Sequence, residues 1–450
     1  METDTENSPA TSVPAGIGFT DRLLSTEEIE SVLDDAFSDW DVDTKKVLIA
    51  IPDGTRTCPL DVLFPIIYGR LAGRVELLDF IIALGTHLPM SEEQICERVG
   101  IQPNEQQTVY SKARFFNHAW DDPNQLTEIG VMSSDEISQI SEGRFEQTLS
   151  VKCNRMVLDY DLLLICGPVF PHEIAGFSGG NKYIFPGIAG AEAIDFSHWL
   201  AGLATCYETI GRKWTPARAV IDRCASMVPI ERKAICMVEK QGGLAGLYAG
   251  VVEEAWAEAA DLSAQVHIEY RDKLFDTVFA VCPEMYDDMW TGGKCMYKTE
   301  PIVAAGGQVI IYAPHITQIS AVHGETIAKI GFHCRDYILA HWGAHKDYPW
   351  SELTYVTVVA GRGTYENGVE SMRAKVFLAT GIPEEECRRM NIGYIDPATL
   401  NPSDYENRED EGILFVAKAG ERLYRLSLIH ISEPTRLLSL AYAVFGVKKK

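Results

Sequence analysis

The chain has 450 residues, of which 46% are hydrophobic and 23% charged, a composition typical of a globular protein with two or three domains. Its net charge of −24 excludes wholesale nucleic-acid binding, because neutralising phosphates requires a basic surface. The sequence holds no run of 18 apolar residues, so no transmembrane helix and no membrane partner are expected. The acidic, polar start is unlike a signal peptide. We therefore expect a cytoplasmic protein with a disordered tail at residues 1–15.

In chain order, the first predicted element is a buried strand at 47–52, "VLIAIP". A helical pattern opened by Pro59 follows, and then a second strand, "LLDFIIAL", at 77–84. A strand–helix–strand unit of this kind implies parallel pairing. Ser91 and Gln94 form a capping box at the start of the next helix, and "LLLIC" predicts a third strand at 162–166. This alternation favours an α/β fold.

The second half of the chain continues the alternation. We expect four further strands, at 276–283, 308–314, 355–361 and 412–420. The stretch between the halves, 242–272, is predicted to contain a long helical core rich in Ala and Glu, which connects the halves. A domain boundary near residue 270 gives an N-terminal α/β domain at 16–270 and a C-terminal α/β domain at 271–425.

Residues 426–450 resemble the translation of a sequencing-library adapter. "LSLIHISEPTR" at 426–436 carries the resemblance, and 440–450 is similar to the continuing adapter followed by a poly-A run. We expect the genuine sequence to end near residue 425. The alternative is an amphipathic C-terminal helix.

Eleven cysteines lie between Cys58 and Cys387 without a Cys-x-x-Cys pair. Their odd number and irregular spacing predict buried, reduced thiols and not a disulfide framework or a zinc ribbon. Cys58 and Cys295 stand near candidate site loops but are not expected to be nucleophiles.

Each of the three N-terminal strands ends in a loop with polar side chains: Asp53, Thr55 and Arg56 after the first, His87 after the second and His172 after the third. Ligands bind outside the carboxyl ends of parallel strands in open α/β sheets. If the three strands are neighbours, Arg56, His87 and His172 converge on one crevice. Weaker candidates are His118, His315 and His323.

The loop "PHEIAGFSGGNKYIFPGIAG" at 171–190 places Lys182 among glycines and apolar residues. It is not a Walker A loop, because Asn181 precedes the lysine and Tyr183 follows it. Apolar surroundings disfavour the ammonium form and make the amine nucleophilic. A phosphate cradle, a covalent attachment point and an ordinary turn all remain open. His198, in "SHW", is either a core histidine or a metal ligand.

The motifs "DGTR", "GTH", "HEIAGFSGGNK…PG" and "SHW" together resemble the nickel-pincer lactate racemase family, over roughly residues 15 to 425. The resemblance implies two α/β domains with the active site in the cleft between them. It also implies a covalently bound nickel-pincer nucleotide, pyridinium-3,5-bisthiocarboxylic acid mononucleotide. By this resemblance Lys182 is the attachment residue, His198 the nickel ligand, and His87 and His172 the acid–base pair.

The resemblance assigns the remaining site residues as well. Asp53, Thr55, Gly179 and Gly180 would contact the cofactor, while Arg56 and Lys294 would hold the substrate carboxylate. The implied reaction is racemisation or epimerisation of a small 2-hydroxy acid by reversible hydride transfer, with cofactor-making enzymes as partners. His87 is followed by Leu88 where the family often has Arg, and Thr291 stands where Gln is common. These departures leave the substrate open, with lactate as the default, and the oligomeric state is also open.

Two other readings compete. A zinc hydrolase would use His87, His172 and His198 as ligands, but the usual short His/Glu spacing is absent and Lys182 stays unexplained. A non-catalytic binding protein with the same fold is the third reading, and the presence of Lys182 with all three histidines argues against it.

Overall fold

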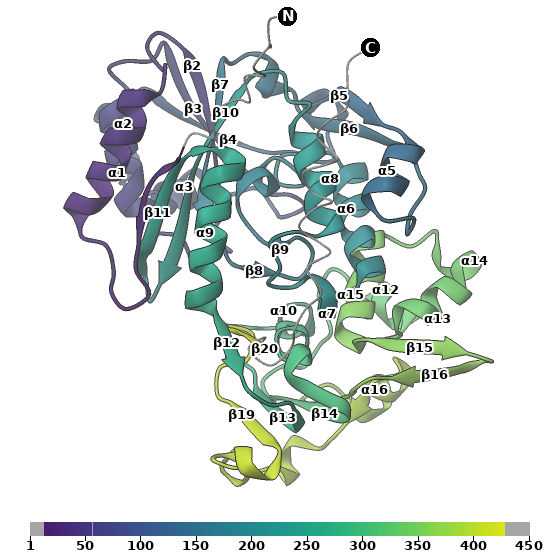
Figure 1. Cartoon of the computed structure of the whole chain (residues 1–450). Helices are drawn as coiled ribbons and strands as arrows, with labels where there is room; N and C mark the ends of the chain where they lie inside the picture. The colour runs from purple at the N-terminus through teal and green to yellow at the C-terminus, as the bar shows by residue number, and fades with distance from the viewer. Residues whose placement is uncertain (1–12, 56, 428–450) are drawn as a thin grey trace, which may run out of the picture.

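The computed structural model describes residues 13–55 and 57–427, which form two sheets with helices around them (Figure 1). The first sheet has the order β1-β11-β10-β7-β2-β3-β4. Its strands are β1 (Ala15–Gly18), β2 (Lys46–Ile51), β3 (Leu77–Ile82), β4 (Ala113–Asn117), β7 (Leu162–Pro168), β10 (Glu231–Lys240) and β11 (Gly243–Val251). The five strands from β10 to β4 run parallel, whereas β11 is antiparallel to both β10 and β1.

The second sheet is entirely parallel and has the order β18-β17-β14-β13-β19. Its strands are β13 (Phe275–Val281), β14 (Val303–Ala313), β17 (Lys375–Thr380), β18 (Gly393–Tyr394) and β19 (Ile413–Val416). An α/β fold with two mainly parallel sheets is thereby confirmed. The position of the domain boundary near residue 270 stays a prediction.

Alternating side chains of the first sheet belong to two hydrophobic clusters, one on each face. Val47 and Ile49 face α1 (Thr26–Asp39) and α2 (Leu60–Leu71), while Leu48 and Ala50 face the opposite side. That opposite side is covered by α6 (Ala191–Ala204), α8 (Pro216–Ala225) and α9 (Val252–His267). Both faces of the parallel strands are therefore buried, as parallel sheets require.

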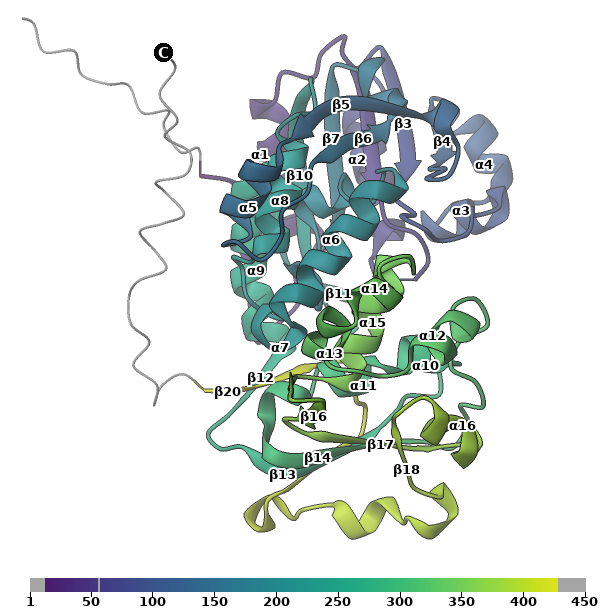
Figure 2. The ribbon, with the colours of Figure 1, turned by 90° about the vertical axis from the view of Figure 1, so that its right-hand side faces the viewer.

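The two halves share one continuous core. In Figure 2, α6 lies directly beside α15 (Trp350–Ala360), which belongs to the second half. The rings of Trp199 and Trp342 stack across this boundary with their centroids 5.3 Å apart. The chain crosses between the halves in a two-stranded parallel ribbon of β12 (Ile268–Arg271) and β20 (Leu423–Leu426).

The remaining α-helices and strands are α3 (Glu92–Arg98), α4 (Pro103–Thr108), β5 (Leu126–Met132), α5 (Ser134–Ile140), β6 (Leu149–Asn154), β8 (Pro171–His172), β9 (Gly176–Phe177), α7 (Cys206–Thr209), α10 (Met289–Gly292), α11 (Lys294–Tyr297), α12 (Gly324–Ile330), α13 (Arg335–Ala340), α14 (Trp342–His345), β15 (Gly363–Glu366), β16 (Val369–Met372) and α16 (Glu384–Arg389).

Two predicted strands are wrong in type or length, and one strand was not predicted. The strand expected at 355–361 is the end of helix α15, whose residues from Glu352 to Ala360 are all buried. A helix buried all round has no polar stripe, so its periodicity cannot be told from that of a buried strand. The helical core expected within 242–272 is confirmed as α9, and the residues before it form strand β11, where a side chain on Gly246 would collide with Leu262 of α9. The strand expected at 412–420 is confined to β19.

The predicted ends of the chain lie mostly outside the described residues. The tail expected at 1–15 extends one residue too far, because Ala15 pairs with Ala249. Of the adapter-like segment, Leu426 pairs with Arg271 in the β12–β20 ribbon, and residues 428–450 lie outside the described part. No helix among the described residues is both long and apolar enough to cross a membrane.

Candidate active site

The three site loops leave neighbouring strands. β3, β2 and β7 are adjacent and parallel, so the loops after their carboxyl ends lie at one edge of the sheet. The backbone N–H of Gly85, in the His87 loop, donates to the carbonyl oxygen of Gly187 in the glycine-rich loop, at 2.9 Å. The loops after β3, β2 and β7 therefore start at one edge of the sheet, while the convergence of His87 and His172 on one crevice stays a prediction. Arg56 lies outside the described residues, and its role stays a prediction.

Asp53 orients His87. Its Oδ2 lies 2.5 Å from Nδ1 of His87, and its Oδ1 accepts hydrogen bonds from the backbone N–H and the hydroxyl of Thr55, at 3.2 and 2.7 Å. Asp53 is buried, whereas half of the His87 side chain is exposed. The cofactor contacts predicted for Asp53 and Thr55 stay predictions. The structure shows instead that both residues fix the imidazole of His87.

His172 lies in the short β8–β9 hairpin and is buried. The backbone N–H of Ile174 donates to its Nδ1 at 3.1 Å, and the carboxylate of Glu173 lies 3.4 Å from the same nitrogen. The hairpin depends on Gly176, whose φ is +79° and where a Cβ would lie 1.9 Å from the carbonyl oxygen of Arg212. Only glycine fits this position, which explains one glycine of the motif.

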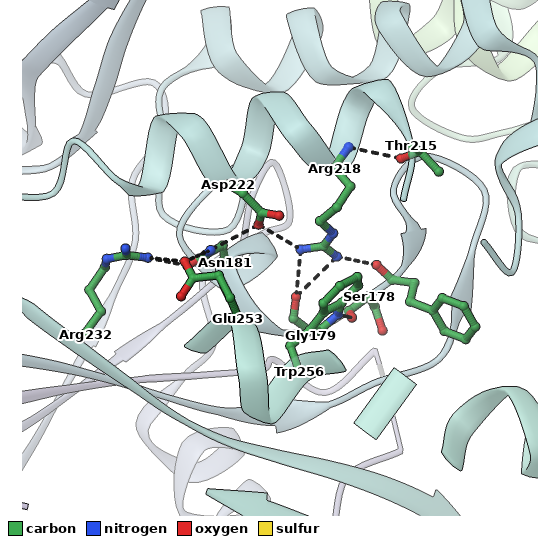
Figure 3. Close-up of polar contacts among 10 residues, drawn as sticks. Ser178, Gly179, Asn181, Thr215, Arg218, Asp222, Arg232, Glu253 and Trp256 are labelled. Carbon is green, nitrogen blue, oxygen red and sulfur yellow. Dashed lines mark hydrogen bonds and ion pairs between the residues drawn. The ribbon is translucent and has the colours of Figure 1, made fainter. Parts of the chain in front are cut away.

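The loop that carries Lys182 is held from behind by a buried polar network (Figure 3). Arg218 of α8 is buried and donates to the carbonyl oxygens of Phe177 at 2.5 Å and Gly179 at 3.4 Å. Its guanidinium stacks over the ring of Trp256, 4.2 Å from the centroid, and Trp256 in turn donates to the carbonyl oxygen of Ser178 at 2.8 Å. Helices α8 and α9 thus fix the backbone of the glycine-rich loop.

Asn181, the residue before Lys182, has its whole amide engaged. Its Nδ2 donates to Asp222 at 3.0 Å and to Glu253 at 2.8 Å, while its Oδ1 accepts from Arg232 at 2.7 Å. A neutral amide is the group that can serve two carboxylates and one guanidinium at once. Lys182 therefore stands on a rigid base.

The backbone conformation and close packing at the two positions before Asn181 explain why both are glycine. Gly179 and Gly180 have φ values of +78° and +57°, and a Cβ there would approach Val169 at 2.6 Å and Trp256 at 2.9 Å. The cofactor contact predicted for these two glycines is not tested by this geometry and stays a prediction.

One ring nitrogen of His198 is fixed by the helix that carries it. It lies in α6, and its Nδ1 is 2.7 Å from the carbonyl oxygen of Ile194, so Nδ1 carries the proton and Nε2 keeps its lone pair. Burial lowers the pKa of His198, and the nearby charge of Lys182 lowers it further. The imidazole is therefore neutral at pH 7, and Lys182 and His198 are electrostatic neighbours.

The second domain contributes Lys294 at the start of α11. Its Nζ lies 4.9 Å from the centroid of the buried Tyr286 ring. In the same helix, burial raises the pKa of Tyr297, and the charge of Glu173 adds to this rise. Glu173, beside His172 in the β8–β9 hairpin, is thus close enough to α11 for its charge to act on Tyr297.

The weaker candidates have structural partners. Both ring nitrogens of the buried His118 contact protein groups, at 2.9 Å from the carbonyl oxygen of Ala189 and 3.2 Å from Asn154. Nε2 of His315 lies 3.1 Å from the carbonyl oxygen of Tyr286, and His323 pairs with Glu352 at 2.7 Å.

The cysteines match the prediction made for them. All eleven are free and buried. Burial raises the pKa of Cys58 to about 12, and the pKa of Cys295 is also raised, first by its hydrogen bond to Cys282. Both thiols stay protonated at neutral pH and are poor nucleophiles.

Sequence reasoning missed the supporting residues Arg218, Asn181, Trp256 and Glu173. Arg218 and Trp256 lie 36 and 74 positions after Lys182 in amphipathic helices, where an isolated Arg or Trp gives no signal of its role. Asn181 and Glu173 lie inside the glycine-rich motif, next to the residues that were predicted. Their adjacency to Lys182 and His172 was the one signal available.

Comparison with known proteins finds one family match and several relatives. Residues 24–206 match the model of the lactate racemase N-terminal domain. The whole chain also shares the fold of the lactate racemase apoprotein from Thermoanaerobacterium thermosaccharolyticum, with a TM-score of 0.69 and 18% identity, covering 92% of this chain and 100% of that one. Residues 24–206 thus form a lactate racemase N-terminal domain, and the chain as a whole has a lactate racemase-like fold.

Further relatives show how much of the chain is similar to known proteins. The curated lactate racemase of Lactiplantibacillus plantarum is 25% identical over 205 residues, which is 43% of each chain. That of T. thermosaccharolyticum is 26% identical over 156 residues, 34% of this chain and 32% of its own. The matched segments thus span less than half of these relatives. A crystal structure of a Thermotoga maritima protein is 32% identical with a TM-score of 0.79, covering 91% of this chain and all of that one.

Proposed function

We propose that the protein racemises or epimerises a 2-hydroxy acid, using a nickel-pincer nucleotide bound covalently to Lys182. The observation that carries the proposal is the setting of His198. This neutral imidazole, with Nδ1 tied to Ile194, is the electrostatic neighbour of a lysine on a rigid glycine-rich loop. The two curated relatives, which match 43% and 34% of this chain, are lactate racemases.

The residues present fit this cofactor. Nε2 of His198 offers the lone pair that would complete the coordination of nickel, which accepts imidazole together with soft sulfur donors. The amine of Lys182 would form the covalent link. When bound, the nucleotide supplies an acceptor for the hydride at C2 of the substrate.

The chain itself supplies binding and proton handling. Removing the C2 hydrogen as hydride gives a planar 2-oxo acid, which can take the hydride back on either face. The hydroxyl proton must leave and return in each turnover, and we assign this task to the imidazoles of His87 and His172. Arg56 and Lys294 are the cations proposed to hold the substrate carboxylate.

A zinc hydrolase has less support. In residues 13–55 and 57–427, no group of three or more His, Cys, Asp and Glu side chains is arranged to hold a metal ion. The three-histidine zinc site of that reading is therefore not formed there. The nickel site proposed here needs one protein imidazole, because the nucleotide provides the other donors.

The experiment is intact-mass and metal analysis of protein co-expressed with cofactor-making enzymes. We expect a covalent adduct on Lys182 and about one nickel ion per chain. Lys182→Arg keeps a cation on the loop but removes the amine, so it should yield unmodified protein. An unmodified Lys182 in demonstrably active protein would contradict the proposal.

A further inference from the structure

Residues 419–426, near the end of the described part of the chain, contact elements on both sides of the candidate site. We call this segment the C-terminal strap. It contains β20, which lies beside β12 where the chain crosses between the halves (Figures 1 and 2). One part of the strap contacts α11, the helix that begins with Lys294. The other part contacts a loop that supports the hairpin of His172.

The first part of the strap packs against Lys294 and its helix. Gly420 has a φ of +91°, and a Cβ at this position would lie 2.9 Å from Cβ of Lys294 and 2.9 Å from the ring of Tyr286. The backbone N–H of Tyr424 donates to the carbonyl oxygen of Lys298 at 2.8 Å, one helical turn after Lys294. The strap thus contacts Lys294 directly and also holds the end of its helix.

The loop between α7 and α8, residues 210–212, supports the hairpin that carries His172. The backbone N–H of Gly211 donates to the carbonyl oxygen of Gly176 at 2.8 Å. Gly176 is the residue that pairs with His172 across the hairpin, and it lies so close to Arg212 that no side chain fits there. A displacement of the loop would therefore be passed to the hairpin.

The second part of the strap holds this loop. The guanidinium of Arg425 donates to the carbonyl oxygen of Ile210. The side chain of Leu423 lies against Gly211, where a Cβ would collide with it. The loop is thus enclosed between the strap on one side and the hairpin on the other.

We propose that the C-terminal strap is a positioning element for the site, in which Gly420 sets the position of Lys294 and Arg425 sets that of His172. This inference rests on the proposed function and deepens it, because Lys294 would hold the substrate carboxylate and His172 would handle the hydroxyl proton. One segment that contacts both sides fixes the distance between these two groups. Catalysis depends on such distances, since a misplacement of about 1 Å can reduce the rate about 100-fold.

Gly420→Ala tests the Lys294 side, in protein whose cofactor adduct and nickel content have been verified. The new methyl group would displace Lys294, so KM for the 2-hydroxy acid should rise about tenfold while kcat stays within about threefold of wild type. Gly368→Ala is the matched control, because its φ is also positive, at +81°, and no atom lies within 4 Å of the new Cβ. Equal KM values in the two variants would contradict this side of the proposal.

Arg425→Met tests the His172 side. It removes the hydrogen bond to Ile210, so kcat should fall about tenfold or more while KM changes little. Arg425→Lys keeps a cation and a donor and should restore most of the lost kcat. The control is Arg422→Met, which breaks an exposed ion pair with Glu269 just before β20 and should keep wild-type kinetics. Wild-type kcat in Arg425→Met would contradict the proposal.

Hydrogen exchange of the unloaded, full-length protein tests the strap without any assay of activity. Arg425→Met should raise amide exchange in the peptides that contain residues 171–177 and 206–212, whereas Arg422→Met should not. If Arg425→Met does not fold, Arg425→Lys takes its place, with a smaller rise expected. Unchanged exchange in both peptides would overturn the proposal. A loaded wild type that acts on no 2-hydroxy acid would contradict the proposed function, whereas the exchange result tests the contacts of the strap by itself.

Discussion

Nδ1 of His198 is 2.7 Å from the carbonyl oxygen of Ile194, one turn earlier in α6. The helix backbone thereby fixes Nδ1 as the protonated nitrogen and leaves Nε2 with its lone pair. Metal-binding histidines commonly gain their orientation from such a contact on the second nitrogen. The burial that lowers the pKa of this ring keeps it neutral, the form that binds metal.

Replacing His198 with Ala should separate nickel retention from covalent attachment. We expect the Lys182 adduct to remain in the intact mass, while nickel content and activity fall to background because one donor is lost. His341→Ala is a matched control, since Nδ1 of His341 also lies 2.9 Å from a helix carbonyl oxygen four residues earlier. Equal nickel loss in both variants would show that His198 is not a nickel ligand.

Arg218→Leu should destabilise the protein. The change leaves Asp222 without its buried partner and frees the carbonyl oxygens of Phe177 and Gly179. We expect the free energy of unfolding to fall by about 3 to 5 kcal/mol, measured by urea denaturation. Arg408→Leu breaks an exposed ion pair with Glu411 and should leave the midpoint almost unchanged. Equal midpoints for the two variants would show that the network does not hold the loop.

Two glycine substitutions should have opposite effects. Gly176→Ala places a Cβ against the backbone of Arg212 at a positive φ, so the free energy of unfolding should fall by about 3 kcal/mol or more. Gly69→Ala, in the interior of α2 with no atom within 4 Å of the new Cβ, should raise it by up to about 1 kcal/mol. Thermal or urea unfolding measures both, and a neutral Gly176→Ala would contradict the packing of the His172 hairpin.

His267 should make stability depend on pH. Burial lowers its pKa to about 4, and its ring contacts Ser263 and the carbonyl oxygen of Glu239. Between its unfolded pKa near 6.5 and this value, the unfolded state binds a proton that the folded state does not, so stability falls as pH falls. At pH 5 the loss should be about 2 kcal/mol relative to pH 7.5. His267→Gln should show a shallower pH dependence, and an unchanged slope would contradict the assignment.

The strands near the site could be predicted because their sequences are short apolar runs that end at polar loops. β2, β3 and β7 follow this pattern, and their parallel order brought two of the predicted loops together. α15 could not be predicted, because a helix packed on all sides by α6 and the second sheet has no polar face to reveal its period. β11 was missed because its glycines and alanines fit closely under α9, a tertiary constraint that local pattern does not show.

The site was predictable only where residues share a motif. Lys182 and His198 stand in short, specific sequences, whereas the Asp53–His87 pair and the Arg218 support join residues 34 or more positions apart. Such partners are determined by the sheet order and by helix packing. The Nδ1 atom of His87 is fixed by a side-chain carboxylate, whereas the Nδ1 atom of His172 accepts a hydrogen bond from a backbone N–H.

The most direct test of the central claim is chiral chromatography of 2-hydroxy acids incubated with protein whose Lys182 adduct and nickel content have been verified. The panel includes lactate, larger apolar 2-hydroxy acids and dicarboxylic ones, each offered as a single enantiomer. We expect at least one member to approach an equal mixture of enantiomers, and Lys182→Arg protein to convert none. Verified, loaded protein that leaves every member of the panel unchanged would contradict the proposed racemase or epimerase function.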